Sequence, residues 1–284
     1  LVYGDTNSTL AGALAATKLN IPVAHVEAGL RSFNRRMPEE VNRVLTDHVS
    51  TLLFAPTRSA VENLDNEGIR NGVIRTGDVM LDLALSMREL FPGRSFEVLE
   101  KIGVQPQGFA LVTIHRAENT DDVDRWSAIV DGLGRLGAAG LPVVWLVHPR
   151  VANKVSELRM QGVHLLSPQP YLETQILLDA ARVVVTDSGG LQKEAAFHER
   201  PCVTVRTETE WVELLEAGVN RLVEAVPEEI RSAALAATWP VSGLPKGLYG
   251  DGSTADHIAG EVRRLLKGET SHQSKSERIG VTRG

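Results

Sequence analysis

The stretch Val183-Val184-Val185-Thr186-Asp187-Ser188-Gly189-Gly190-Leu191-Gln192-Lys193-Glu194-Ala195 decides the predicted fold. Its β-branched run is typical of a buried strand that ends at Asp187, and a helix is expected to begin at Leu191. The free N–H groups and the dipole at a helix start favour phosphate, and the two glycines allow a ligand to approach the backbone. Glycines after a strand also make plain turns, so the pattern alone leaves both interpretations open.

Two further side chains of this stretch extend the phosphate-site hypothesis. Ser188 brings a hydroxyl donor to the turn that it forms with Gly189 and Gly190. Glu194 follows Gly190 by one helical turn, so it faces back toward the loop, where its carboxylate can accept hydrogen bonds from a ribose. The stretch therefore predicts a site for a phosphate and a neighbouring ribose.

Short apolar segments alternate with segments of helical period along the rest of the chain. Strands are expected at residues 1–3, 23–26, 52–55, 73–75, 109–114, 143–147, 164–166, 202–205 and 221–223. Helices are expected at residues 8–19, 38–50, 59–67, 81–90, 123–136, 152–160, 172–181, 228–237 and 254–266. This alternation predicts an α/β fold of two doubly wound, Rossmann-like units, each a parallel sheet covered by helices on both faces.

The helical period breaks at Phe91-Pro92-Gly93-Arg94, where a proline and a glycine predict a domain boundary. We expect a first domain at residues 1–91, a second at residues 92–266 and a polar, flexible tail at residues 267–284. The chain opens at Leu1 without a methionine and already inside a strand. We therefore expect the first domain to be incomplete.

The net charge of −6, without a basic stripe, argues against nucleic acid as the main partner. No signal peptide and no apolar run long enough to span a bilayer occurs within these residues. The single cysteine, Cys202, excludes an internal disulfide framework and suits a reducing compartment. We therefore expect a cytoplasmic protein without a membrane partner.

Charged or titratable residues follow the predicted strands at the same relative place in both halves. They are Asp5, Glu27, His115 with Arg116, His148 with Arg150, and Asp187 with Ser188. Doubly wound sheets bind ligands beyond the carboxyl ends of their strands. Each residue alone is explained equally well as a helix cap, a satisfied histidine or a solvated ion pair. Together they predict one cleft between two domains.

Three carboxylates of the first half are candidates for proton transfer. Glu27 ends an apolar strand, so partial burial is expected to raise its pKa toward the useful range. Glu39 and Glu40 follow Pro38 at a helix start, where complementarity to the helix dipole explains Glu40 well and Glu39 less well. Asp5, Glu27 and Glu39 are expected to converge above one sheet and to remove and return a proton on a bound sugar.

No metal or redox cofactor site is predicted. The eight histidines are scattered without the short spacings of a zinc site, and no Walker loop occurs. A Ser-His-Asp hydrolase is excluded because its Gly-x-Ser-x-Gly elbow is missing.

The sequence resembles the non-hydrolysing UDP-N-acetylglucosamine 2-epimerases of bacteria from Leu1 to about Leu266. The motifs that carry the resemblance are Gly4-Asp5-Thr6, His25-Val26-Glu27-Ala28-Gly29-Leu30-Arg31, Pro38-Glu39-Glu40-Val41-Asn42-Arg43, Thr113-Ile114-His115-Arg116-Ala117-Glu118-Asn119, Pro168-Gln169-Pro170-Tyr171, Asp187-Ser188-Gly189-Gly190-Leu191-Gln192-Lys193-Glu194 and Tyr249-Gly250-Asp251-Gly252. So many motifs in order make the resemblance specific to this family.

The resemblance implies a fold like the B-type glycosyltransferases (GT-B), with the nucleotide sugar between two Rossmann-like domains. It also implies that about half of the N-terminal domain precedes Leu1, including a Gly-Thr-Arg-Pro-Glu-like loop whose basic residues help to hold the diphosphate. Members of the family are typically dimers, so a homodimer is expected. No redox or metal cofactor is implied.

The resemblance further implies the reaction. In the family, loss of the C2 proton and elimination of UDP leave a 2-acetamidoglucal. UDP then adds back, which interconverts UDP-GlcNAc and UDP-ManNAc for cell-surface polysaccharide precursors. The implied catalytic residues are Asp5, Glu27, Glu39 and His115, the histidine helping UDP to leave. The implied binding residues are Arg116, Ser188, Gly189 and Gly190 at the diphosphate, Gln169 near the uracil and Glu194 at the ribose.

Two departures from the family pattern bear on the substrate. Many members read Thr-Glu-Arg-Pro-Glu where this chain has Thr209-Glu210-Trp211-Val212-Glu213, so Trp211 replaces an arginine expected near the ligand. The loop between Glu27 and Pro38, which helps to form a second, activating UDP-GlcNAc site in some relatives, is shorter and carries Arg35-Arg36. Both changes resemble the branch that acts on UDP-2,3-diacetamido-2,3-dideoxyglucuronate, where a basic pair would meet the sugar carboxylate. A solvated loop is the alternative explanation of the basic pair.

Two other functions stay open. A glycosyltransferase of the same fold would keep Ser188, Gly190 and Glu194 but has no reason to need Glu27 and Glu39 together. A non-catalytic nucleotide-sugar sensor would bind UDP without turnover.

Overall fold

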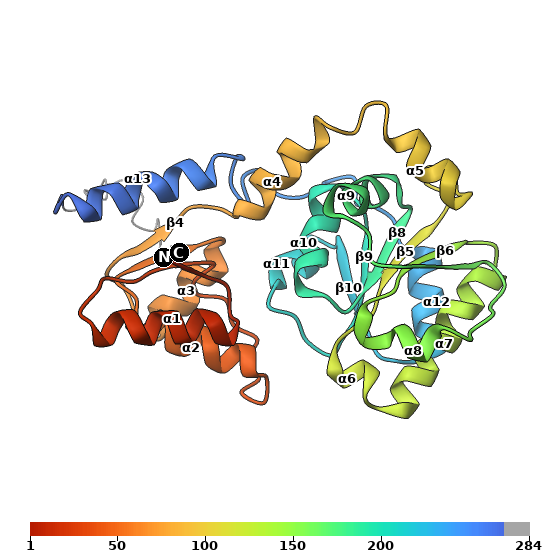
Figure 1. Ribbon diagram of the computed structural model, residues 1–284, viewed down its shortest axis with the longest axis horizontal. Helices are drawn as coiled ribbons and strands as arrows, with labels where there is room; N and C mark the ends of the chain where they lie inside the picture. Colours follow the sequence, from red (N-terminus) through yellow and green to blue (C-terminus); the bar gives the residue numbers. More distant parts are fainter. Residues whose placement is uncertain (270–284) are drawn as a thin grey trace, which may run out of the picture.

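The computed structural model describes residues 1–269, which form two α/β units, each built on one sheet (Figure 1). The first sheet has the strand order β1-β2-β3-β4, and the second has the order β10-β9-β8-β5-β6-β7. All described strand pairs are parallel. The predicted α/β fold with two parallel-sheet units is confirmed, whereas the predicted tail lies outside the described residues from residue 270 onward.

The first unit runs through β1 (Val2–Tyr3), α1 (Asn7–Lys18), β2 (Ala24–Val26), α2 (Pro38–Val49), β3 (Leu52–Ala55), α3 (Arg58–Asn66) and β4 (Val73–Arg75). Two helices, α4 (Val79–Arg88) and α5 (Ser95–Ile102), lead to the second unit. That unit runs through β5 (Ala110–Thr113), α6 (Ala117–Thr120), α7 (Val123–Ala138), β6 (Val143–Leu146), a 3₁₀ turn (Pro149–Val151), α8 (Ala152–Val155), β7 (Val163–Leu166), α9 (Tyr171–Ala180), β8 (Val183–Thr186), α10 (Gly189–Phe197), β9 (Cys202–Val205), α11 (Val212–Glu216), β10 (Asn220–Val223) and α12 (Pro227–Ala236). The last described helix is α13 (Thr254–Leu266).

Local signals explain where the helices of the first unit begin. The hydroxyl of Thr6 accepts a hydrogen bond from Thr9 N at the start of α1, and Thr57 does the same for Ala60 N at α3. Pro38 is the first residue of α2, a position that costs no hydrogen bond. The connections after β1 and β3 are therefore short, residues 4–6 and 56–57, and their polar residues stay near the strand ends. The connection after β2 is longer, residues 27–37, and Glu27 is its first residue.

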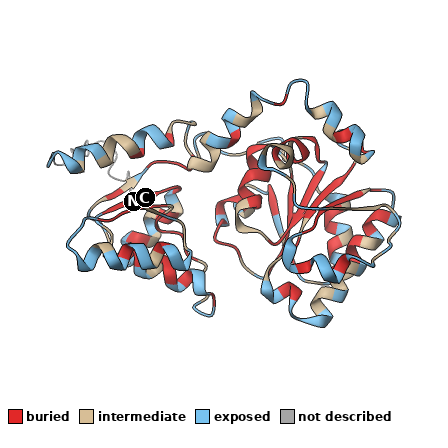
Figure 2. Ribbon diagram, in the orientation of Figure 1, coloured by how far each residue is buried: buried red, intermediate tan, exposed pale blue. Residues whose placement is uncertain are grey.

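The four central strands of the second sheet, β5, β6, β8 and β9, are buried on both faces (Figure 2). Successive side chains of a strand point to opposite faces, so Val183 and Val185 of β8 pack in one apolar cluster. That cluster includes Ile129 of α7 and Ile230 of α12. Val184 packs on the other face in a separate cluster. The unbroken β-branched run of β8 is thus explained by helices on both sides of the sheet.

The order in which strands are added reverses between β5 and β8. From β5 the chain proceeds to β6 and β7 on one side, and from β8 it proceeds to β9 and β10 on the other. Ligands of doubly wound sheets bind at such a switch point, outside the carboxyl ends of the strands. The connections after β5 and after β8 are therefore placed where a ligand is expected.

Helix α13 follows the second unit in sequence but lies against the first sheet (Figure 1). Its Ile258 packs with Val26 of β2 and Phe54 of β3. Helix α4 contacts both α13 and α10, so it links the two units. The domain boundary after residue 91 stays a prediction.

The helix prediction differs from the structure in several details, including the bounds of α4, which begins and ends two residues earlier than predicted. Helix α10 begins at Gly189, two residues early, because Ser188 caps it there. The helix predicted at residues 152–160 ends at Val155. Beyond it the carbonyl of Ser156 accepts a hydrogen bond from the guanidinium of Arg159, so it is not paired with the backbone N–H of a further helical turn. The short helices α5, α6 and α11 are absent from the prediction.

Candidate functional site

One buried carboxylate joins the two connections at the switch point. Asp187 accepts hydrogen bonds from the backbone N–H groups of His115 and Arg116, each at 3.0 Å, and from Asn119 Nδ2 at 3.0 Å. Asp187 therefore does not cap helix α10, which was the alternative explanation of this residue; Ser188 is the cap. The connection that carries His115 and Arg116 is instead fastened beside the start of α10.

The start of α10 offers unpaired backbone N–H groups. Ser188 is the N-cap, and its Oγ accepts from Leu191 N at 3.5 Å. Gly189 and Gly190 form the first turn, where N–H groups have no acceptor within the helix. Both glycines are half-buried rather than covered. The arrangement suits an anion, as the sequence predicts.

Three arginines surround one carboxylate beside this helix start. Glu210 Oε2 accepts from Arg206 at 3.0 Å, and Glu210 Oε1 lies 3.9 Å from Arg116 NH2. Burial would raise the pKa of this carboxyl, but the cations Arg206, Arg43 and Arg116 lower it overall. A Cβ on Gly189 would come within 2.5 Å of Glu210 Oε1, so the carboxylate lies directly against the glycine.

Arg206 keeps two donor atoms free. Its side chain is 1% exposed, yet its Nε and NH2 atoms have no hydrogen-bond partner among the described residues. Unpaired buried donors are costly, and a phosphate group offers the oxygen acceptors that a guanidinium prefers. Neither Arg206 nor Glu210 was predicted from the sequence, where their spacing of four residues was the only local signal of their pairing.

Glu27 of the first unit is ion-paired with helix α10 of the second. Lys193 Nζ lies 2.7 Å from Glu27 Oε1 and 2.5 Å from Asp78 Oδ2. Glu27 directly follows β2 and has a φ of +72°, which is unfavourable for a residue with a side chain. Burial raises its pKa, as expected from the sequence, while Lys193 opposes the shift. Neither Lys193 nor Asp78 was predicted to belong to the site.

Asp5 and Glu40 share one arginine. Arg43 donates to Asp5 Oδ2 at 2.6 Å and to Glu40 Oε2 at 2.9 Å. Glu40 is buried and also accepts from Ser32 N at 2.9 Å, so it has a structural role. Glu39 is exposed on the first turn of α2, without a side-chain hydrogen bond among the described residues. Of the three predicted carboxylates, Asp5 and Glu27 are held by cations, while Glu39 stands apart.

His115 lies between Asp187 and His148. Its Nδ1 is 3.4 Å from Asp187 Oδ1, and its ring stacks on that of His148 with centroids 5.0 Å apart. Burial lowers the pKa of His115, Asp187 opposes the shift, and His148 and two nearby arginines lower the pKa further. The lowered pKa favours the neutral imidazole, which has one N–H to donate.

Glu194 belongs to a buried chain of polar side chains. Gln175 Nε2 donates to Glu194 Oε1 at 2.8 Å, and Gln175 Oε1 lies 2.8 Å from His198 Nε2. Asp179 is the next partner, 3.1 Å from His198 Nδ1. Burial raises the pKa of Glu194. Gln169 is half-buried and donates within its own loop at 2.8 Å.

Trp211 lies beneath these residues rather than at the surface. It is 2% exposed, and Lys193 Nζ sits 4.1 Å from the centroid of its ring. The edge of Tyr249 contacts the same ring, with centroids 6.1 Å apart. Direct contact between Trp211 and a ligand stays a prediction, because the structure gives the ring a packing role under the lysine.

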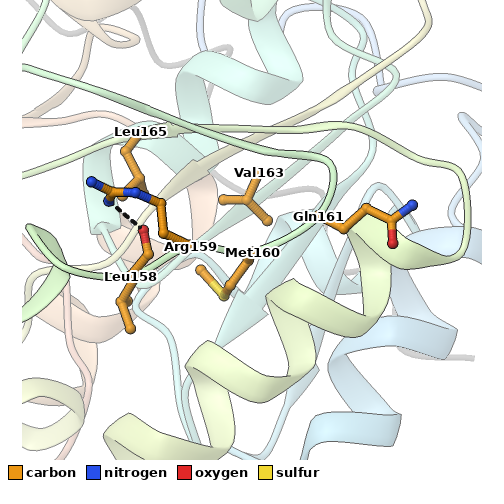
Figure 3. A pocket seen from close by; sticks show the side chains of 6 residues that line it. All are labelled: Leu158, Arg159, Met160, Gln161, Val163 and Leu165. Carbon is orange, nitrogen blue, oxygen red and sulfur yellow. Dashed lines mark hydrogen bonds between the residues drawn. The ribbon is translucent and has the colours of Figure 1, made fainter.

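A separate hollow of about 410 Å³ opens beside β7 (Figure 3). It is lined by Leu158, Arg159, Met160, Gln161, Val163 and Leu165. None of the predicted site residues lines it, and its lining contains no acidic side chain. The chemistry described above therefore lies elsewhere, at the contact between the units.

Residues 1–269 contain neither a metal cluster nor a membrane span. No group of three or more His, Cys, Asp or Glu side chains in this part of the chain is arranged to hold a metal ion. No helix there is both long and apolar enough to cross a membrane.

Comparison with known proteins gives consistent matches. The family model described as UDP-N-acetylglucosamine 2-epimerase matches residues 1–263. The UDP-2,3-diacetamido-2,3-dideoxy-D-glucuronate 2-epimerase of Pseudomonas aeruginosa is 47% identical over 270 residues, which are 93% of this chain and 74% of that protein. A UDP-N-acetylglucosamine 2-epimerase homolog of Methanococcus maripaludis is 43% identical over 272 residues, 93% of this chain and 75% of that protein.

Solved structures agree with the fold. The crystal structure of Methanocaldococcus jannaschii UDP-GlcNAc 2-epimerase in complex with UDP-GlcNAc and UDP matches with a TM-score of 0.83 at 38% identity. The match covers 94% of this chain and 75% of that chain. The two-unit, GT-B-like architecture predicted from the sequence is therefore shared with this UDP-GlcNAc 2-epimerase structure.

Proposed function

The chain belongs to the UDP-N-acetylglucosamine 2-epimerase family, and from that membership we propose that it inverts C2 of a UDP-linked 2-acetamido sugar, interconverting UDP-GlcNAc and UDP-ManNAc. The observation that carries the proposal is the ion pair between Glu27 and Lys193, which joins the two units. It supports a proton acceptor from one unit and an anion-binding helix from the other acting on one ligand.

Glu27 is the proposed acceptor of the C2 proton. As that proton leaves, the bond between C1 and the phosphate oxygen breaks, and its electron pair goes to UDP. The 2-acetamidoglucal that remains has a C1–C2 double bond. In the return step the UDP oxygen attacks C1, and C2 receives a proton on its other face. We assign this donor role to Asp5 and Glu39, of which Asp5 is already oriented by Arg43. Before the next turnover Glu27 releases its proton to solvent, and the donor takes one up from solvent.

The developing charge on UDP requires donors that are in place before reaction. We assign this role to Arg116, His115 and the N–H groups of Gly189 and Gly190, with Ser188 beside them. The unpaired donors of Arg206 support the same assignment. Glu194 is the proposed ribose acceptor, Gln169 lies in the proposed uracil neighbourhood, and Trp211 supports the binding surface from below.

Exchange of the C2 proton tests this proposal. The purified protein, expressed from its complete reading frame, is incubated with UDP-GlcNAc in D₂O, and NMR should show deuterium at C2 together with formation of UDP-ManNAc. A Glu27→Gln variant should bind UDP but lose exchange. Transfer of the sugar to an acceptor without exchange would instead indicate a glycosyltransferase. Tight UDP binding without any turnover would indicate a sensor.

A second candidate substrate is UDP-2,3-diacetamido-2,3-dideoxyglucuronate. The Pseudomonas relative named for that sugar is 47% identical to this chain. Arg35 and Arg36 are exposed, and their loop reaches the second unit, where Asn34 Nδ2 donates to Glu208 Oε1 at 2.6 Å. Neither guanidinium has an ion pair or side-chain hydrogen bond with residues 1–269, so both are available to attract a sugar carboxylate.

Kinetics with both sugars separate the two candidates. If the uronate is the substrate, an Arg35→Gln, Arg36→Gln double variant should raise the KM for the uronate about tenfold. The same variant should leave the KM for UDP-GlcNAc within about twofold, since that sugar has no carboxylate. Equal effects on both sugars, or none on the uronate, would contradict the carboxylate role.

We propose further that the protein works as a cytoplasmic homodimer with domains divided after residue 91. The resemblance to the family supports the dimer, and the single cysteine supports a reducing compartment. The segment between Arg88 and Ser95, which separates helices α4 and α5, supports the boundary. Light scattering, cell fractionation and limited proteolysis test these three points.

A further inference from the structure

Lys193 is a fully buried lysine whose ammonium has three defined neighbours. It is 0% exposed, although it carries a charge that is costly to bury unless it is paired. Its Nζ contacts Glu27 Oε1 at 2.7 Å, Asp78 Oδ2 at 2.5 Å and the face of the Trp211 ring at 4.1 Å from the centroid. Two carboxylates and an aromatic face account for the three donors of an ammonium group.

Asp78 is held in place by its role as the N-cap of helix α4. Its Oδ1 accepts from Met80 N at 2.8 Å and so caps helix α4, while its Oδ2 faces Lys193. Trp211 is equally fixed because it is buried in an apolar cluster with Tyr249. The ammonium position is therefore set by the capped start of α4 and by Trp211 of the second unit, rather than by Glu27.

Glu27 is held through one oxygen only. Its Oε1 bonds Lys193, whereas Oε2 has no hydrogen bond among the described residues and lies 3.6 Å from where a Cβ on Gly4 would be. The side chain is 17% exposed, so this second oxygen is accessible. The positive φ of Glu27 is a strained conformation for a residue with a side chain, and the ion pair with Lys193 offsets part of that strain.

We propose that Lys193 is a positioning residue for the epimerisation, which holds Glu27 ionised and leaves its Oε2 free to take the C2 proton. Asp78 and Trp211 fix the ammonium from behind. This inference rests on the proposed function, because it assigns Glu27 the role of the base.

The charges around Glu27 determine the sign of the effect. Lys193 of α10 is the cation in contact with it, while Asp78 before α4, Asp5 after β1 and the phenol of Tyr3 in β1 face the same region. Burial favours the neutral acid, Lys193 favours the carboxylate, and Asp78 and Asp5 again favour the acid. Removing the lysine should therefore raise the pKa of Glu27, and neutralising Asp78 should lower it.

Two variants with opposite expected shifts test the inference. In Lys193→Met, the acidic limb of the kcat–pH profile should move up by about one pH unit or more. In Asp78→Asn, which keeps an acceptor for the cap of α4, the limb should move down. Lys154→Met is the matched control, because Lys154 also lies over a tryptophan ring, 5.7 Å from the centroid of Trp126, but away from Glu27. Its limb should match the wild type.

If Lys193 had only a packing role, the two variants would change kcat or stability, but their acidic limbs would not move in opposite directions. If both variants are folded and active but keep the wild-type limb, the inference is wrong. If Lys193→Met is inactive or unfolded, Asp78→Asn alone decides by the direction of its shift.

An activity-independent readout separates the charge arrangement from the reaction. The Glu27 carboxyl is titrated by ¹³C NMR in wild type and Asp78→Asn, with assignment by loss of the signal in Glu27→Gln. A lower pKa in Asp78→Asn supports the charge arrangement, and an equal or higher value overturns it. Absence of C2 exchange in an enzyme with the expected titration would contradict the proposed function and not the positioning of Glu27.

Discussion

The carboxylate of Asp187 and the backbone N–H of His115 are joined by hydrogen bonds of 3.0 and 3.1 Å to the two carboxylate oxygens. The bonds connect the ends of β5 and β8, the two strands at the switch point. Arg116 N and Asn119 Nδ2 donate to the same carboxylate. Both carboxylate oxygens of Asp187 therefore act as hydrogen-bond acceptors.

Asp187→Asn should be strongly destabilising for that reason. The new NH₂ group would face donors, so at least one buried charge-assisted hydrogen bond is replaced by a repulsive contact. We expect the free energy of unfolding to fall by about 3 kcal/mol, measured by urea denaturation. Asp131→Asn, which removes an exposed pair with Arg135, should cost less than about 0.5 kcal/mol. Similar losses for the two variants would contradict the role of Asp187.

Gly189 and Gly190 are adjacent but should not be equivalent. A Cβ at Gly189 would meet Glu210 Oε1 at 2.5 Å, so the carboxylate and its arginines would have to move. A Cβ at Gly190 would meet only Met80 Cε at 3.5 Å, an ordinary contact. Calorimetry should show that Gly189→Ala weakens UDP binding about tenfold or more, with a smaller loss for Gly190→Ala. The reverse order would mean that the diphosphate does not depend on the Glu210 cluster.

The loss of stability caused by substituting His198 should depend on pH. Burial lowers its pKa in the folded protein, with Asp179 opposing the shift, so the unfolded chain binds the proton more readily. The stability that depends on neutral His198 is present above the unfolded pKa and is lost as the pH falls toward the folded pKa. The difference in unfolding free energy between wild type and His198→Asn should therefore shrink between pH 7 and pH 5. The decrease should reach at most about 1.4 kcal/mol for each pH unit that separates the folded pKa from the unfolded pKa. Urea denaturation at three pH values measures it, and a constant difference would show that His198 does not titrate as described.

Local sequence predicts the helix start near Ser188 but not the role of Lys193. The strand before Ser188 depends on β-branched residues, and the helix after it depends on a cap, and these residues are neighbours in the chain. The sequence therefore predicts a strand followed by a helix, and only the first turn of the helix was misplaced. Lys193 escaped prediction because its partners are 166 and 115 residues away. Nothing near Lys193 in the sequence indicates that its face of α10 meets another unit.

Glu39 and Glu40 illustrate the same limit on a smaller scale. Both follow Pro38, and both complement the dipole of α2. Glu40 is the buried one because the backbone N–H groups of Ser32 and Phe33, in a loop that folds back, need an acceptor. A local pattern cannot rank two neighbouring carboxylates when tertiary contacts decide which one is turned inward.

Gln175 should affect substrate binding without touching the chemistry. Its amide donates to Glu194 Oε1 at 2.8 Å and faces His198 with its oxygen, so Gln175→Leu leaves a buried carboxylate oxygen without its donor. If Glu194 holds the ribose equally in ground state and transition state, KM should rise about tenfold while kcat stays within about twofold. Gln161→Leu, an exposed glutamine at the hollow beside β7 (Figure 3), is the matched control and should change neither. A fall in kcat with unchanged KM would instead assign the Glu194 chain to the reacting sugar, because only a contact made in the transition state has that effect.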